Sequence, residues 1–164
     1  MNELRQMIES ASASAEMLFY KQGEVLPIWQ CIDENGKFIL LAHPPTDDKE
    51  EAFALIKEAL PKLKIIRVLF INEAWTLKEE RSAPTGAELD RVMREGLRNH
   101  PKRNEVVMFW GEDYENGVVT ACRKIIRAKG SAPMLGPLEF DTLGPGTVSQ
   151  GRLASMLPPR GKMQ

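Results

Sequence analysis

The chain has 164 residues, of which 43% are hydrophobic and 27% are charged. A chain of this length and composition can bury a core of its own, which excludes a wholly disordered protein. Lys and Arg number 22 against 23 Asp and Glu, so the net charge of -1 provides no overall field that would attract nucleic acid or an anionic membrane. Either partner would need a local patch.

Glycine and proline are concentrated toward the C-terminal end of the sequence. Residues 130–164 contain 6 of the 12 Gly and 5 of the 11 Pro. Gly costs backbone entropy in a regular element and Pro removes a hydrogen-bond donor, so this stretch does not favour long helices or strands. We therefore expect one domain over residues 1–129, followed by a C-terminal extension over residues 130–164 that packs on this body or on a partner.

The first 22 residues have the apolar spacing of an amphipathic helix, and Gly23 stands where a C-terminal cap belongs. Charged residues interrupt this stretch, so it lacks the layout of a signal peptide. No window approaches the roughly 18 apolar residues of a membrane span. Cys31 and Cys122 are 91 residues apart and are expected to be buried thiols. These features predict a cytoplasmic protein without a membrane partner.

Two Asn-Gly pairs indicate β-hairpins, because Asn-Gly readily adopts the positive φ angles of a tight turn. The pairs are Asn35-Gly36 and Asn116-Gly117, and the strands that they predict are Val25–Asp33, Lys37–Ala42, Glu105–Asp113 and Gly117–Lys129. Each strand is rich in apolar residues. The two hairpins predict an antiparallel sheet.

The segment between the hairpins contains two helix signals and one strand signal. Asp47 and Glu50 form a capping pair for a helix that stops at Pro61. Lys64–Thr76 is apolar on both faces, which is typical of a central strand covered on both sides. A second capping box predicts a helix from Thr85 to Asn99.

The C-terminal extension adds a short expected strand at Leu138–Phe140 and a short expected helix at Ser149–Leu157. The predicted order is helix, hairpin, helix, strand, helix, hairpin and extension. Antiparallel hairpins with interspersed helices indicate an α+β, two-layer domain. We expect a mostly antiparallel sheet of about five strands with helices packed on it.

Motifs for cofactor binding and catalysis are absent from the sequence. It contains no phosphate-binding loop, dinucleotide fingerprint, zinc-protease helix motif or nucleophile elbow. The sequence therefore predicts no cofactor and favours a protein that is not an enzyme.

Both histidines, His43 and His100, directly precede a proline at the end of a predicted element. A residue before proline is biased toward an extended conformation, so we interpret these pairs first as element boundaries. An alternative hypothesis brings the two histidines together with Glu73 or Asp113 as ligands of a divalent metal. Nothing in their spacing fixes that geometry.

Glu73 lies near the end of the otherwise apolar central strand. Burial would raise the pKa of its carboxyl group and make it a candidate general acid or base. With His43 and His100 as catalytic partners, Glu73 would define a small metal-dependent or acid–base hydrolase. The simpler interpretation is that the strand has reached solvent at this residue.

One basic stretch has no intervening acidic residue, and it falls in the last predicted strand of the body. It consists of Arg123, Lys124, Arg127 and Lys129. Arg123 and Arg127 would share one face of the strand, a spacing that could follow a phosphate backbone. The neutral charge balance and the lack of an RNA-binding aromatic signature favour a solvated strand face instead, so a nucleic-acid partner is the weaker hypothesis.

Three segments resemble a group of bacterial and phage-associated proteins. They are Asn72-Glu73-Ala74-Trp75, His100-Pro101-Lys102-Arg103-Asn104-Glu105-Val106-Val107 and Leu135-Gly136-Pro137-Leu138-Glu139. The similarity covers roughly residues 25–140. That group carries no assigned activity or catalytic residues, so the resemblance implies a bacterial, prophage or phage origin and transfers no function.

The sequence favours a non-catalytic accessory or protein-interaction module. The expected partner is another protein or a second copy of the chain, and the N-terminal helix and the C-terminal extension are the expected contact regions. The hydrolase and the nucleic-acid accessory protein are the alternatives.

Overall fold

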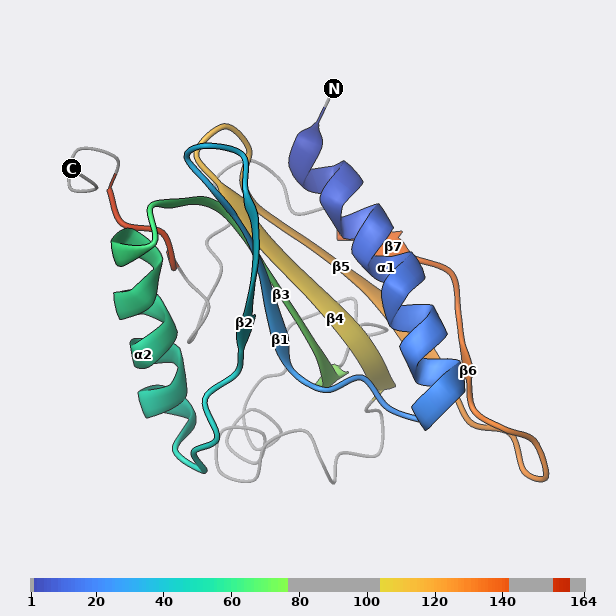
Figure 1. Ribbon diagram of the computed structural model, residues 1–164. Coiled ribbons are helices and arrows are strands. Elements are labelled where there is room, and N and C mark those ends of the chain that lie inside the picture. The colour runs from blue at the N-terminus through green and yellow to red at the C-terminus, as the bar shows by residue number, and fades with distance from the viewer. Residues whose placement is uncertain (1, 77–103, 142–154, 160–164) are drawn as a thin grey trace, which may run out of the picture.

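The computed structural model describes residues 2–76, 104–141 and 155–159, which form two helices and seven strands (Figure 1). The helices are α1 (Glu3–Gln22) and α2 (Lys49–Lys62). The strands are β1 (Ile28–Asp33), β2 (Phe38–Ala42), β3 (Ile65–Thr76), β4 (Asn104–Asp113), β5 (Gly117–Ile126), β6 (Met134–Leu135) and β7 (Glu139–Phe140).

The strands build one antiparallel sheet in the order β2-β1-β3-β4-β5-β6, and β7 also pairs with β5. β3 is central, since β1 and β4 flank it over most of its length. Its residue Phe70 lies opposite Trp29 of β1 on one side and opposite Trp110 of β4 on the other. A row of aromatic side chains therefore crosses the middle of the sheet.

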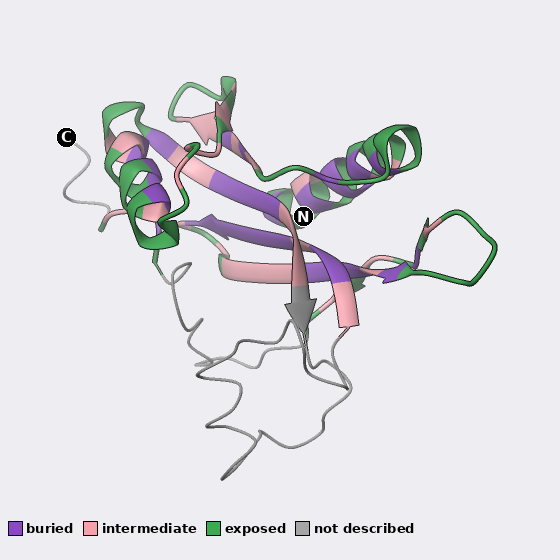
Figure 2. Ribbon diagram, turned by 90° about the horizontal axis from the view of Figure 1, so that it is seen from below, coloured by how far each residue is buried: buried purple, intermediate pink, exposed green. Residues whose placement is uncertain are grey.

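The two helices cover opposite faces of the sheet, and each helix turns its buried side toward it (Figure 2). On one face α1 packs over β3, β4 and β5, where Leu69, Ile71 and Phe109 are buried. On the other face α2 packs near the aromatic row. Side chains alternate between the faces of a strand, so β3 can serve both cores only because its residues are apolar at successive positions.

Local signals define the ends of α1. The Asn2 side chain accepts a hydrogen bond from the N–H of Arg5 at 2.9 Å, which caps the first turn. Gly23 ends the helix with a φ of 80°, a left-handed conformation that glycine adopts without steric cost. The apolar stripe predicted for this segment is the side buried against the sheet.

The second helix is capped one residue later than expected. Asp48, not Asp47, accepts the capping hydrogen bond, from the N–H of Glu51 at 3.2 Å. Thr46 fixes this choice, because its hydroxyl accepts a hydrogen bond from the N–H of Asp48. The helix also continues through Pro61, which lies in its last turn, and ends at Lys62.

The α+β fold class and the antiparallel sheet are confirmed, and both Asn-Gly turns join the expected strands. The described residues contain seven strands instead of about five, because two short strands also pair with β5: β7, which falls within the strand expected at Leu138–Phe140, and β6, which was not expected. β5 ends at Ile126, three residues before the expected Lys129. Residues 155–157 are not helical, and the helix expected at 85–99 lies outside the described residues.

The described parts of the C-terminal extension contact the sheet. The strands β6 and β7 pair with β5, and Met156 and Leu157 are buried in the cluster on the α2 side. Neither helix in the described ranges is long and apolar enough to cross a bilayer.

Because α1 lies close to β4 at Gly111, we predict that a side chain added at this position destabilises the fold. A Cβ atom at this position would lie 2.8 Å from Cδ1 of Leu4, which is fully buried. Gly111→Ala should therefore lower the free energy of unfolding by about 1–3 kcal/mol, the usual cost of overpacking. Urea unfolding followed by circular dichroism measures this change.

Gly136→Ala is the matched control, because a Cβ atom there meets its nearest neighbours at 3.6–3.7 Å, an ordinary contact distance. Leu4→Ala removes a fully buried side chain and should itself cost about 2–5 kcal/mol, but this cost should be smaller in the Gly111→Ala background, where the truncation also removes the clash. Equal stability of the two glycine variants would contradict this account of how α1 docks.

Candidate functional site

One edge strand of the sheet is apolar and exposes large hydrophobic side chains. β2 reads Phe38-Ile39-Leu40-Leu41-Ala42, without charge or proline, and β1 is its one neighbouring strand among the described residues. Phe38 and Leu40 are 52% and 55% exposed. Proteins usually protect an edge strand with charges, prolines or bulges, since an open edge can pair with another chain. β2 has none of these protections.

The two faces of β2 have different surroundings. Ile39 and Leu41 lie opposite Cys31 and Trp29 of β1 and pack against the cluster on the α2 side. Phe38, Leu40 and Ala42 point to the face on which α1 lies, but α1 packs over β3, β4 and β5 and not over β2. These three side chains are exposed.

The register of the hairpin shows which backbone groups face the open edge. The N–H of Asp33 donates to the carbonyl of Lys37 at 3.0 Å, so these residues form a hydrogen-bonded pair. Bonded and non-bonded pairs alternate in an antiparallel ladder, which makes Ile39 and Leu41 the next residues bonded to β1. The N–H and carbonyl groups of Phe38, Leu40 and Ala42 therefore point outward.

We call the exposed strand formed by residues 38–42 the β2 edge. The sequence contains a signal for it that the hairpin interpretation does not use. A half-buried strand is expected to alternate between apolar and polar residues, whereas residues 38–42 are apolar without interruption. In a central strand such a run is covered on both sides, but in an edge strand it leaves one apolar side exposed.

His43, a predicted catalytic and metal-binding residue, belongs to an aromatic cluster. Its Nδ1 accepts a hydrogen bond from the indole N–H of Trp29 at 3.0 Å, and its ring stacks on Phe70 at 5.3 Å between centroids. Burial lowers the pKa of its imidazole. A neutral ring with Nδ1 already bonded anchors the end of β2 to the aromatic row.

Glu73 lies at an open hollow of about 150 Å³, which is also lined by Glu105 and Arg127. Arg127 donates a hydrogen bond from Nε to Oε2 of Glu105 at 3.0 Å, and its Nη2 forms an ion pair with the same oxygen at 2.9 Å. Burial raises the pKa of Glu73, although the backbone N–H of Val25 acts in the opposite direction by donating to its carboxylate. The predicted acid–base residue is thus placed beside a second carboxyl group and a guanidinium.

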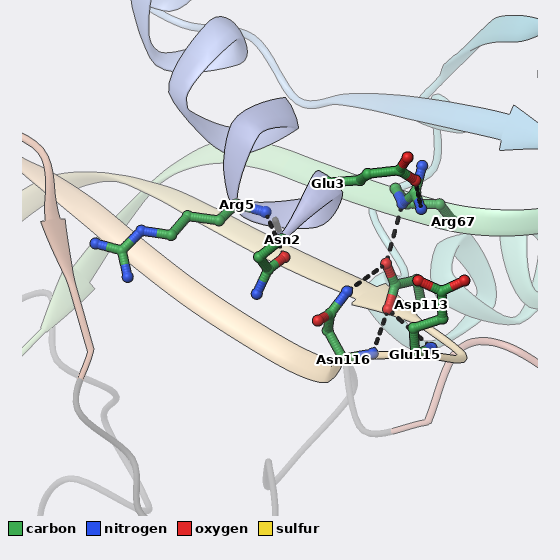
Figure 3. A network of polar contacts seen from close by, with 7 residues as sticks. All are labelled: Asn2, Glu3, Arg5, Arg67, Asp113, Glu115 and Asn116. Carbon is green, nitrogen blue, oxygen red and sulfur yellow. Dashed lines mark hydrogen bonds and ion pairs between the residues drawn. The ribbon is translucent and has the colours of Figure 1, made fainter.

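Asp113, the other predicted metal ligand, takes part in a network of hydrogen bonds and ion pairs (Figure 3). Arg67 of β3 donates to it at 3.0 Å and to Glu3 of α1 at 2.6 Å. The same carboxylate accepts backbone N–H bonds from Glu115 and Asn116 in the β4–β5 turn. Asp113 therefore closes this hairpin and, through Arg67, connects it to the start of α1.

The three predicted metal-binding or catalytic residues that the structure describes, His43, Glu73 and Asp113, do not lie together. Asp113 lies opposite Arg67 in the register, six residues along β3 from Glu73, a separation of about 20 Å at ~3.3 Å per residue. His43 contacts the aromatic row on the opposite face from Glu73. No group of three His, Cys, Asp or Glu in the described ranges could hold a metal ion.

His100 lies outside the described residues. The metal-site hypothesis with His43, His100 and Asp113, and the hydrolase hypothesis with Glu73 and both histidines, therefore stay predictions.

The basic stretch does not present one continuous surface. Arg123 is buried, and it donates to the carbonyl of Gly136 at 2.6 Å and to Glu16 of α1 at 2.8 Å. Arg127 follows the last residue of β5 and forms an ion pair with Glu105. Lys124 falls on the opposite face by strand alternation, and Lys129 lies beyond the end of β5. The nucleic-acid hypothesis stays a prediction, with Arg123 serving the fold.

Comparison with protein-family models, with curated proteins and with solved structures finds no match to this chain.

The raised pKa of Glu73 predicts how its replacement changes stability with pH. A raised native pKa means that the folded state disfavours the charged carboxylate, so stability falls as pH rises from the ordinary value of 4.5 through the native pKa. Glu73→Gln should therefore raise Tm at pH 8, and this gain should shrink as pH falls toward 4.5. Differential scanning calorimetry measures both values.

Glu105→Gln is the matched control in the same hollow, because it weakens the ion pair with Arg127 and should give no such gain. A Tm for Glu73→Gln equal to or below that of the unaltered chain at pH 8 would contradict the prediction.

Proposed function

We propose that this chain is a non-catalytic protein-interaction module that assembles with a second copy of itself through the β2 edge. The observation that carries the proposal is the uncharged, proline-free edge strand with Phe38 and Leu40 half exposed. We further propose an accessory role in a bacterial or phage-infected cytoplasm. The buried thiols of Cys31 and Cys122 support this compartment, and burial raises the pKa of Cys31 to about 12, which makes its thiol unreactive.

A second copy fits the β2 edge because the strand is self-complementary. With a two-fold axis at Leu40, this residue lies opposite its own copy and Phe38 lies opposite Ala42 of the mate. These are the residues whose backbone groups point outward, and each bonded antiparallel pair exchanges two N–H···O bonds. The same register keeps every side chain of the strand opposite an apolar side chain.

Charge does not oppose this pairing. The next pair in the register sets Lys37 opposite His43 of the mate, and burial keeps the His43 imidazole neutral by lowering its pKa. No like charges therefore face each other directly across the five-residue strand or at its ends. An axis normal to the sheet would join the two sheets edge to edge and place both exposed Phe38–Leu40 faces on one side.

Leu40→Lys tests this assembly. The introduced ammonium groups would face each other at the axis, and lysine on an edge strand discourages pairing. Sedimentation velocity of the full chain should give a mass near twice 18.5 kDa for the unaltered protein and near 18.5 kDa for Leu40→Lys.

Leu55→Lys is the control, since Leu55 is a comparably exposed leucine, 47% accessible, on α2 instead of β2. It should sediment as the unaltered chain does. A monomer for the unaltered chain across the concentration range, or a dimer for Leu40→Lys, would overturn the proposal.

A further inference from the structure

A buried carboxylate on β4 holds the described part of the C-terminal end. Glu112 is 7% exposed, and each of its two carboxylate oxygens accepts a backbone hydrogen bond, from Met156 at 3.0 Å and from Leu157 at 2.8 Å. These two N–H groups belong to successive residues that lie more than forty positions further along the chain. Glu112 thus recognises main chain, a feature that any sequence of suitable conformation can offer.

The conformation of Ser155 directs the two amides toward Glu112. Its φ of 53° is in the left-handed region, which is strained for a residue other than glycine. A change of backbone hand at one residue can turn the following N–H groups to the same side, where they form a concave anion-binding nest. The strained residue Ser155 directly precedes the two amides that bond to Glu112.

Apolar and polar contacts flank this interaction. Met156 and Leu157 are 1% and 6% exposed and pack in the cluster that contains Trp29 and Trp110. The hydroxyl of Tyr114 donates to the carbonyl of Pro158 at 2.6 Å. The body therefore contacts three consecutive residues, 156–158, through two buried apolar side chains, two backbone amides and one proline carbonyl.

The contacts of residues 155–159 are those of a bound peptide more than of a packed element. The segment forms no helix or strand, and it bonds to Glu112 through two amides and to Tyr114 through one carbonyl. Beside it lies an open hollow of about 550 Å³, lined by the segment itself and by Lys57 and Tyr114. Domains that bind short linear motifs combine main-chain hydrogen bonds with pockets for a few side chains in this way.

We propose that the groove formed by Glu112, Tyr114 and the neighbouring core is a peptide-binding site, and that residues 155–159 are its releasable intramolecular ligand. The class of ligand is a short peptide with two adjacent apolar residues followed by proline, as in Met156-Leu157-Pro158. Glu112 selects a backbone that presents two successive N–H groups. The site does not use Phe38 or Leu40 and is independent of the proposed dimer.

Hydrogen exchange of the unaltered full chain tests whether the segment is releasable. The amides of Met156 and Leu157 should exchange at least a hundredfold faster than those of Phe109 and Trp110 in the core of β4, because the segment opens without unfolding of the sheet. Exchange of both pairs at one rate would show that the segment leaves only when the domain unfolds, and it would overturn the proposal.

Peptide binding tests the site itself. The probe is a fluorescent peptide with the sequence of residues 151–164, titrated into the full chain and into the full chain carrying Leu157→Asp, which displaces the internal segment. The peptide should bind the variant at least tenfold more tightly, since the internal segment no longer competes. Adding Glu112→Gln should weaken this binding at least tenfold, because an amide offers one acceptor oxygen where the carboxylate offers two.

A peptide that itself carries Leu157→Asp is the matched control and should not bind. Equal binding to the unaltered chain and to the Leu157→Asp variant would overturn the proposal, as would no binding to the variant. Loss of the β-sheet circular dichroism signal in Leu157→Asp would also overturn it, because the segment would then be an obligatory part of the fold.

Discussion

A central strand that is apolar on both faces is the constraint on which this structure depends. β3 turns Val68 and Phe70 to one side and Leu69 and Ile71 to the other, and all four are buried. One helix cannot cover both sides, so α1 and α2 divide the faces between them. Within the described ranges each face carries one helix, which does not span the whole sheet, and Phe38 and Leu40 of β2 are exposed.

The two edges of the sheet differ in how they are covered. At the β5 end, two short strands pair with β5, and the buried Arg123 ties this region to α1 through Glu16. At the β2 end, no strand follows among the described residues, and the strand carries no charge of its own. This asymmetry motivates the self-association that we propose, since an apolar edge is costly to leave in water and ready to pair.

Two buried charged residues, Arg123 and Glu112, are held by partners far away in the sequence. Arg123 reaches Glu16, and Glu112 accepts amide hydrogens from Met156 and Leu157. Each interaction leaves a paired group inside, which limits the cost of burying a charge. These contacts connect the sheet to α1 and to residues 155–159.

Most of the fold could be predicted from the sequence because its signals are local. Asn-Gly turns specify the hairpins, and the apolar spacing of residues 3–22 specifies α1. The short strand β6 was harder to predict, since its two residues depend on pairing with β5 and not on their own propensity.

The candidate sites were less predictable for the same physical reason. Glu73 stands out locally as a carboxylate in an apolar strand, but its neighbours Glu105 and Arg127 are brought to it by strand register. Similarly, a basic stretch gives no indication that Arg123 is buried under α1. In the sequence Glu112 looks like any acidic residue near a turn, because its partners Met156 and Leu157 are more than forty residues away and only the fold brings them to it.

Disulfide trapping at the β2 edge tests the central claim most directly, with the buried Cys31 and Cys122 left in place. Bonded antiparallel residues have Cα atoms about 5.5 Å apart, within the range of a disulfide. Leu40→Cys should therefore link two chains, whereas Phe38→Cys should not, because it is offset from its own copy by four residues, about 14 Å along the strand. Phe38→Cys mixed with Ala42→Cys should link again. Failure of Leu40→Cys to cross-link, or equal linking by Phe38→Cys alone, would contradict the two-fold pairing of β2.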